Sequence, residues 1–219
     1  MKPINFIVFF ALILAGCISL PNSPMSPTPR FYALTPIDEK KVGADLACPV
    51  KGGVSARIPG AMGDRLKAMI IGVGPVKIPE YLDRPQMVTK DKKGILKFDE
   101  FNRWGESLDL GTARLIREDL AVMLPGAKLT LYPWNPSIAV KYQVIVEVVQ
   151  LDSQLDRDMF LVMQWTVIDV QHSKTVIIKR SEFRKAIVPQ DYSGLAKTLS
   201  AACASLSSQM LSVFIHKGF

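Results

Sequence analysis

Three segments in the second half of the chain alternate apolar and polar residues with a period of two. Residues two apart share one face of a β-strand, so each segment has one apolar face. The first two apolar faces consist of Tyr142, Val144, Val146 and Val148, and of Leu161, Met163, Trp165 and Val167; the third segment runs from Thr175 to Phe183. Polar turns at 152–158 and 171–174 separate the segments. Because such short connections join antiparallel neighbours, the sequence predicts three antiparallel strands with Trp165 in the core.

Two further segments have the period of an amphipathic helix. The first runs from Ser107 to Leu124 and is stopped by Pro125 and Gly126. The second begins near Tyr192, and its apolar residues recur at steps of three and four: Leu195, Leu199, Ala202, Leu206, Met210 and Val213. On the first helix we expect Arg114, Arg117 and Glu118 to face solvent, opposite the apolar stripe.

Shorter apolar or β-branched runs predict the remaining strands. They lie at 31–34, 68–78 and 128–132, and a hairpin pairs 86–89 with 95–98 around the turn 91–94. Strands interrupted by two amphipathic helices indicate an α+β fold. We expect one two-layer domain over 31–219, with a mostly antiparallel sheet, both helices packed on one side, and a flexible insertion around 40–66.

The first thirty residues have the pattern of an export signal and a membrane anchor. Lys2 and the apolar run 6–15 are followed by Leu14-Ala15-Gly16-Cys17, which matches the bacterial lipobox. We expect residues 1–16 to be a signal peptide, Cys17 to be lipidated, and the Pro- and Ser-rich residues 17–30 to form a tether. The alternative is an ordinary signal peptide with a chance cysteine. Ile18, rather than an aspartate, follows the cysteine, which favours the outer membrane over the inner one.

Composition excludes several other classes of protein. With 48% hydrophobic residues the chain can bury a core, so it is not a disordered protein. The formal charge of +7 is spread along the chain, without the alternating basic and aromatic residues of a nucleic-acid platform. The two histidines, His172 and His216, lie far apart in the sequence and outside any metal-ligand spacing, so we expect no metal and no cofactor.

No catalytic motif is recognisable. The acidic residues that could furnish a carboxylate pair are Asp83, Asp99, Glu100, Glu106 and Asp109, and we expect them to be solvated instead. Once Cys17 is lipidated, Cys48 and Cys203 could form a disulfide in an oxidising compartment, although two unpaired cysteines are the simpler interpretation. The sequence therefore predicts a protein that is not an enzyme.

A stiff turn is the best candidate for partner contact. Prolines at 79 and 85 bracket Tyr81-Leu82-Asp83-Arg84 and restrict its backbone. Tyrosine and arginine are enriched in interface hot spots, so Tyr81, Asp83, Arg84 and Gln86 are candidate partner-contact residues. The alternative is a turn in which Arg84 pairs with a carboxylate only to hold the loop.

The same region carries a family resemblance. The strings Ile71-Gly72-Val73-Gly74-Pro75-Val76 and Tyr81-Leu82-Asp83-Arg84-Pro85-Gln86-Met87-Val88-Thr89, with Arg103-Trp104 and Gln164-Trp165 further on, are similar to the ABC-type transport auxiliary lipoproteins of the PqiC (YmbA) family. The likeness covers nearly all of the chain after the signal and thins between Lys40 and Arg65. Two departures are Lys90, where an arginine is expected, and Ser107, where a proline is expected.

This resemblance implies a non-catalytic, lipid-anchored subunit of an MCE-type ABC lipid transport system. Its partners would be the periplasmic MCE-domain protein and the inner-membrane ABC permease system, with homo-oligomerisation as a further option. The chain would dock the lipid-carrying component at the outer membrane and support envelope integrity. Two alternative functions would also suit a small exported domain. One is a lipoprotein activator or scaffold of cell-wall synthesis, and the other is a periplasmic hydrolase with a carboxylate site.

Overall fold

Two sheets and two long helices make up the part of the chain that this computed structural model describes, residues 27–38 and 69–216. In chain order the elements are β1 (Arg30–Tyr32), β2 (Ile70–Lys77), the short 3-10 helix η2 (Glu80–Leu82), β3 (Gln86–Lys90), β4 (Leu96–Trp104), α3 (Leu108–Met123), β5 (Lys128–Leu131), β6 (Tyr142–Ser153), β7 (Asp158–Asp169), β8 (Lys174–Ala186) and α4 (Tyr192–His216). The expected signal peptide, Cys17, Cys48 and the insertion around 40–66 lie outside the described residues.

The larger sheet has five strands in the order β5-β2-β6-β7-β8. Its β6, β7 and β8 are antiparallel neighbours, which confirms the prediction from the period-two alternation. The strand β2 instead pairs in parallel with both β5 and β6. Parallel neighbours need a long crossover connection, and the chain supplies one between β2 and β5 through the smaller sheet and α3.

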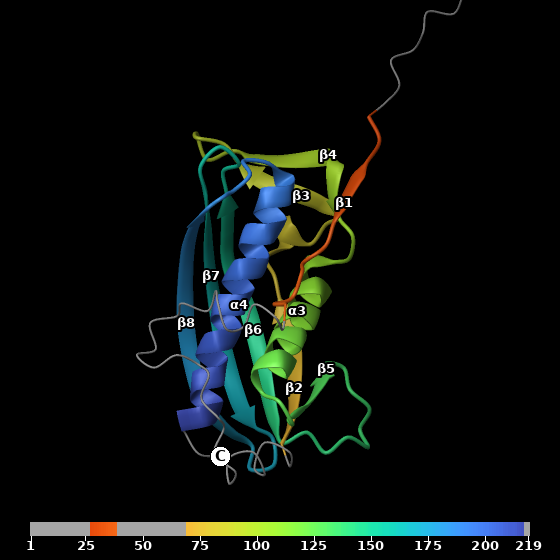
Figure 1. Cartoon of the computed structure of the whole chain (residues 1–219), viewed down its shortest axis with the longest axis vertical. Coiled ribbons are helices and arrows are strands. Elements are labelled where there is room, and N and C mark those ends of the chain that lie inside the picture. Colours follow the sequence, from red (N-terminus) through yellow and green to blue (C-terminus); the bar gives the residue numbers. More distant parts are fainter. Residues whose placement is uncertain (1–26, 39–68, 217–219) are drawn as a thin grey trace, which may run out of the picture.

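Both helices pack on the same face of the larger sheet (Figure 1). The apolar stripe of α4 is buried as predicted, and so are Leu115, Ile116 and Leu120 on α3. Trp165 is completely buried, and its indole Nε1 donates to Ser181 Oγ at 3.0 Å. The larger sheet and the two helices form two layers, and most of the paired strand residues are antiparallel. The predicted α+β two-layer domain is therefore confirmed.

The helix α4 is long and apolar enough, by length and composition, to cross a membrane over residues Tyr192–Ile215. Its stripe from Leu195 to Phe214 nevertheless packs into the core against the sheet and α3. The core of the domain therefore explains the apolar character of this helix.

The smaller sheet has three strands in the order β1-β4-β3 and lies at the end of the molecule where the described chain begins at residue 27 (Figure 1). The hairpin of β3 and β4 is confirmed, whereas β1 pairs in parallel with β4. The register between β3 and β4 shifts between Gln86 and Met87, so residues 100–102 of β4 form a bulge. Asp99 holds this bulge by accepting hydrogen bonds from the amides of Phe101 and Asn102, each at 2.8 Å.

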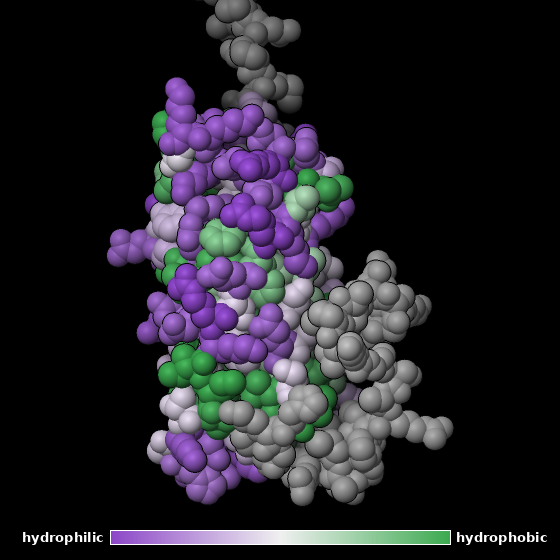
Figure 2. All heavy atoms as spheres, turned by 90° about the vertical axis from the view of Figure 1, so that its left-hand side faces the viewer, coloured by the Kyte–Doolittle hydropathy of each residue, from purple (hydrophilic) through white to green (hydrophobic). Residues whose placement is uncertain are grey.

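The strand β8 is the edge of the larger sheet, and its side of the molecule is hydrophilic over most of its length (Figure 2). Charged residues on this strand include Lys179, Arg180, Glu182, Arg184 and Lys185. Charges on an edge strand disfavour pairing with a strand of another chain.

Candidate functional site

The turn between Pro79 and Pro85 connects the two sheets, and Tyr81 points from it into the domain. The ring of Tyr81 packs against the core, and its hydroxyl lies 3.3 Å from the carbonyl oxygen and 3.2 Å from the amide nitrogen of Leu151 in β6. The parallel partner β2 ends at Lys77, opposite Glu147 of β6. Tyr81 therefore satisfies backbone groups of β6 beyond the point where β2 stops pairing with it.

Arg84 is half-buried and contacts the smaller sheet. Its guanidinium carbon lies 4.2 Å from the centroid of the Phe98 ring in β4, which is a cation–π contact. Its Nε is buried and, within the described residues, has no hydrogen-bond partner. Phe98 itself is 42% exposed, so the pair presents an apolar ring beside a half-buried arginine.

Gln86 and Asp83 complete the predicted contact residues. The amide of Gln86 donates to the carboxylate oxygens of Glu100 at 3.3 and 3.4 Å, and Glu100 also pairs with Arg103 at 3.1 Å. Asp83 is exposed. The structure thus brings Arg84 and Gln86 beside β4, whereas the hydroxyl of Tyr81 is engaged inside the fold.

Exposed apolar side chains on the smaller sheet and its hairpin were not identified from the sequence. They are Phe31, Ile95, Phe98 and Phe101, with exposed fractions of 66%, 58%, 42% and 41%. A run such as Leu96-Lys97-Phe98-Asp99-Glu100-Phe101 shows no regular alternation, because the bulge in β4 changes which residues face outward. We call Phe31, Phe98 and Phe101, together with Arg84, the aromatic surface.

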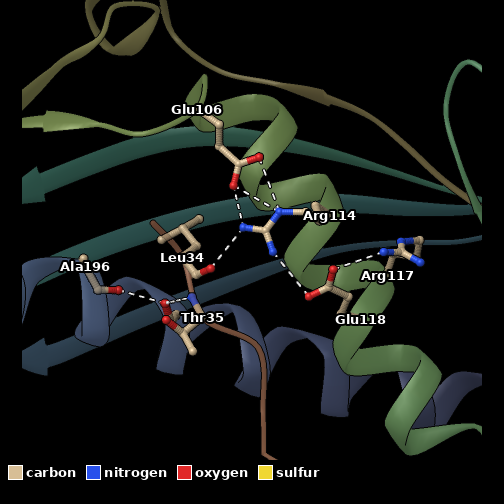
Figure 3. A network of polar contacts seen from close by, with 8 residues as sticks. Leu34, Thr35, Glu106, Arg114, Arg117, Glu118 and Ala196 are labelled. Atoms are coloured by element: carbon tan, nitrogen blue, oxygen red, sulfur yellow. Dashed lines mark hydrogen bonds and ion pairs between the residues drawn. The ribbon is translucent and has the colours of Figure 1, made fainter. Parts of the chain in front are cut away.

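A second polar network holds the segment that follows β1 against both helices (Figure 3). Arg114 of α3 donates to the carbonyl of Leu34 at 3.1 Å, and the amide of Thr35 donates to Ser200 Oγ of α4 at 3.1 Å. The amide of Ile37 donates to the carboxylate of Asp119 at 2.9 Å. We call residues 34–37 with these side chains the N-terminal clasp.

The clasp corrects our expectation that Arg114, Arg117 and Glu118 face solvent. Arg114 is paired with Glu106 and, at 3.3 Å, with Glu118, which also pairs with Arg117 at 3.1 Å. The hydrogen bond with Glu106 raises the pKa of the Arg114 guanidinium, against the opposing effect of burial. These side chains are half-buried because the segment after β1 crosses this side of α3, which a helical pattern alone does not reveal.

Asp119 is the buried carboxylate of the clasp. Burial raises the pKa of Asp119 to about 6, although the hydrogen bonds from Ile37 and from Ser207 Oγ oppose that rise. A buried carboxyl group that receives a backbone hydrogen bond links the N-terminal segment to the helical layer. The clasp therefore fixes how the chain enters the domain.

Comparison with protein families decides what kind of protein this is. The model of the ABC-type transport auxiliary lipoprotein component family matches residues 55–211. The chain belongs to this family. The match includes α3, most of α4 and every strand except β1.

Solved structures support the same fold for this ABC-type transport auxiliary lipoprotein component. A crystal structure of an uncharacterized protein is 17% identical with a TM-score of 0.58, covering 66% of this chain and 90% of that chain. Protein XCC0632 from Xanthomonas campestris is 10% identical with a TM-score of 0.53, covering 65% and 80% respectively. The search of curated proteins gives no match. At these identities the likeness concerns the fold alone.

The two departures from the family pattern have clear places in the auxiliary lipoprotein. Lys90 lies 3.0 Å from Asp152 and so makes a carboxylate contact with β6. Ser107 occupies the N-cap position of α3 without a side-chain capping hydrogen bond.

The other candidate residues mainly contact other parts of the fold or are buried in it. Glu106 is engaged with Arg114, and Asp99 with the bulge of β4. Cys203 is buried in α4, and burial, with a smaller effect from Asp119, raises the pKa of its thiol to about 12. Its predicted disulfide partner Cys48 lies outside the described residues. Within residues 27–38 and 69–216 no group of three His, Cys, Asp or Glu side chains could hold a metal ion.

Proposed function

We propose that this auxiliary lipoprotein is a non-catalytic subunit of an MCE-type ABC lipid transport system, anchored through Cys17 and docking the periplasmic lipid-carrying protein at the outer membrane. Membership of the ABC-type transport auxiliary lipoprotein component family supports a role beside a transporter. The MCE partner, the outer-membrane location and the support of envelope integrity extend that role and rest on the sequence resemblance.

One observation carries the docking proposal, namely the aromatic surface on the smaller sheet. Phe31, Phe98 and Phe101 are each more than 40% exposed on a sheet of only three strands. Exposed aromatic rings beside an arginine are the composition of interface hot spots, since they bury large apolar areas around one directional cation. We propose this surface, with Asp83 and Gln86 at its side, as the place where the partner binds.

The clasp gives the docking surface a defined position. The strand β1 pairs in register with β4, with Tyr32 opposite Trp104, and residues 34–37 are then held by α3 and α4. A partner bound at the aromatic surface would therefore lie beside the segment that leads back to the proposed lipid anchor.

Co-purification tests this function. The lipid-anchored chain is isolated from membranes in mild detergent, and its partners are identified by mass spectrometry. We expect an MCE-domain protein with the parent and at least tenfold less of it with Arg84→Ala. The control Arg180→Ala changes an exposed arginine on β8, which pairs with Glu182 at 3.2 Å, and should retain the partner. Recovery of a peptidoglycan synthase in place of an MCE-domain protein would support the cell-wall scaffold instead.

A further inference from the structure

A basic hollow lies between the tip of the β3–β4 hairpin, the turn between β6 and β7, and the first residue of α4. Its volume is about 610 Å³, and its charged lining residues are four lysines, Lys90, Lys92, Lys93 and Lys97, and two aspartates, Asp91 and Asp156. The docking proposal does not use this hollow. Its lining residues come from 89–97, from 155–156 and from Tyr192, so the hollow exists only in the folded chain.

The four lysines of the hollow outnumber the two aspartates that line it. Lys90 is paired with Asp152 and Lys92 with Asp156, each at 3.0 Å. Lys93 and Lys97 are exposed and form no ion pair within the described part of the chain. Two ammonium groups are therefore available to an anionic ligand, and compact ammonium charges suit phosphate oxygens.

The hairpin tip holds these lysines in a defined geometry. One carboxylate oxygen of Asp91 accepts hydrogen bonds from the amides of Lys93 and Ile95, each at 2.9 Å. Gly94 adopts a φ of 85°, in the left-handed region that favours glycine, and its amide donates to the carbonyl of Asp91 at 3.0 Å. A turn constrained in this way presents its side chains at a lower entropic cost than a free loop.

Apolar residues accompany the lysines. Ile95, at the end of the hairpin turn, is 58% exposed, and Leu155 of the facing turn lines the hollow and packs partly against the core. Tyr192 lines the hollow as well, and its ring packs partly against the core. A ligand with an anionic group and an adjoining apolar part would match both features.

The β3–β4 hairpin and the start of α4, which line the hollow, lie at the same end of the molecule as residue 27 (Figure 1). The proposed lipid anchor, Cys17, precedes residue 27 by only ten residues in the sequence. Ten residues span at most about 35 Å even when fully extended, so this end of the domain would remain close to the membrane.

From charge, shape and position together we propose that the hollow binds a phosphate ester, supplied by the headgroup of an anionic phospholipid. Lys93 and Lys97 contact the phosphate oxygens, and Ile95 contacts the beginning of the acyl region. The proposal shares only the Cys17 anchor with the proposed function, and direct binding measurements test it without the transport partner.

Isothermal titration of the complete lipid-anchored chain in neutral detergent tests the site, with each titrant also injected into detergent alone. The titrants are dihexanoyl-phosphatidylglycerol, dihexanoyl-phosphatidylcholine and inorganic phosphate. We expect the phosphatidylglycerol to bind most tightly. Each lysine close to an anionic lipid contributes about fivefold to the affinity, so the double variant Lys93→Gln, Lys97→Gln should bind it roughly 30-fold more weakly.

A matched control removes the same charge from the opposite end of the molecule. The double variant Lys128→Gln, Lys174→Gln changes two exposed lysines at the starts of β5 and β8 and should bind as the parent does. Equal affinity for the two phospholipids, or equal losses in the two double variants, would overturn the proposal. Inorganic phosphate binding as tightly as phosphatidylglycerol would overturn the assignment to a lipid headgroup.

Discussion

The hydroxyl of Tyr81 lies within 3.3 Å of both backbone polar groups of Leu151, at the level of β6 where β2 no longer runs beside it. Tyr81 thereby satisfies backbone groups of β6 that β2 does not reach. The same contact links the proline-bracketed turn to the larger sheet. Arg84, three residues later, is left to contact Phe98 at the surface. The turn thus combines Tyr81, which contacts the larger sheet, with a half-buried Arg84 that contacts the smaller sheet.

Tyr81→Phe should lower the free energy of unfolding by about 1–3 kcal/mol, because the substitution leaves the amide of Leu151 buried without its partner. Urea denaturation measures this effect. The control Tyr132→Phe changes a tyrosine that is 49% exposed and should alter stability by less than about 0.5 kcal/mol. Partner recovery should persist in Tyr81→Phe, and its loss in a folded variant would contradict the structural role.

Trp165→Ala should lower the free energy of unfolding by about 3–5 kcal/mol. The indole is completely buried, and its Nε1 bonds to Ser181, whose hydroxyl in turn donates to Gln209 of α4 at 2.6 Å. The substitution empties a large volume and leaves this polar chain incomplete. A denaturation midpoint equal to that of the parent would place the indole outside the core.

Stability should fall with rising pH through the titration of Asp119. Burial raises the pKa of this carboxyl to about 6 in the folded state, above the ordinary value of 3.8. Between these two values the folded state holds a proton that the unfolded state releases, so the contribution is complete below about pH 4 and is lost as the pH passes 6. The loss amounts to about 3 kcal/mol at pH 7.

Asp119→Asn provides the comparison for this pH dependence, because an amide cannot titrate but can still accept from Ile37. The difference in unfolding free energy between parent and variant should change between pH 4 and pH 7 in favour of the variant. A constant difference over that range would contradict the assignment to Asp119.

Several parts of the fold follow from local pattern. Strict alternation around Trp165 predicts the antiparallel strands, because one apolar face can only point inward. The apolar run of β2 carries no information on direction, so its parallel pairing with β5 and β6 depends on a crossover that local pattern does not show. Local pattern also does not show that β3 and β4 belong to a separate sheet.

The candidate site was predictable only in part. Prolines at 79 and 85 draw attention to Arg84 and Gln86, and the structure places both beside β4. The exposed ring of Phe101 depends on the bulge held by Asp99, and Arg114 is half-buried only because a segment 80 residues earlier covers it. Contacts of this kind arise from tertiary packing and leave no periodic signal.

Cys17→Ala should abolish acylation and leave the precursor uncleaved after Gly16, since lipidation needs the thiol of the lipobox. Metabolic labelling with palmitate and fractionation of membranes measure the two effects. The control variant Ser19→Ala keeps the lipobox, and we expect it to incorporate palmitate as the parent does. Palmitate labelling of the Cys17→Ala chain would show that the anchor lies elsewhere.

Site-specific photo-crosslinking in intact cells tests the docking proposal most directly. A photoreactive amino acid replaces the exposed Phe101 of the aromatic surface or, as a control, the exposed Lys174 at the opposite end of the molecule. The proposal predicts a crosslink from position 101 to an MCE-domain protein and none from position 174. A crosslink to that protein from position 174 alone, or to a cell-wall synthase from position 101, would contradict it.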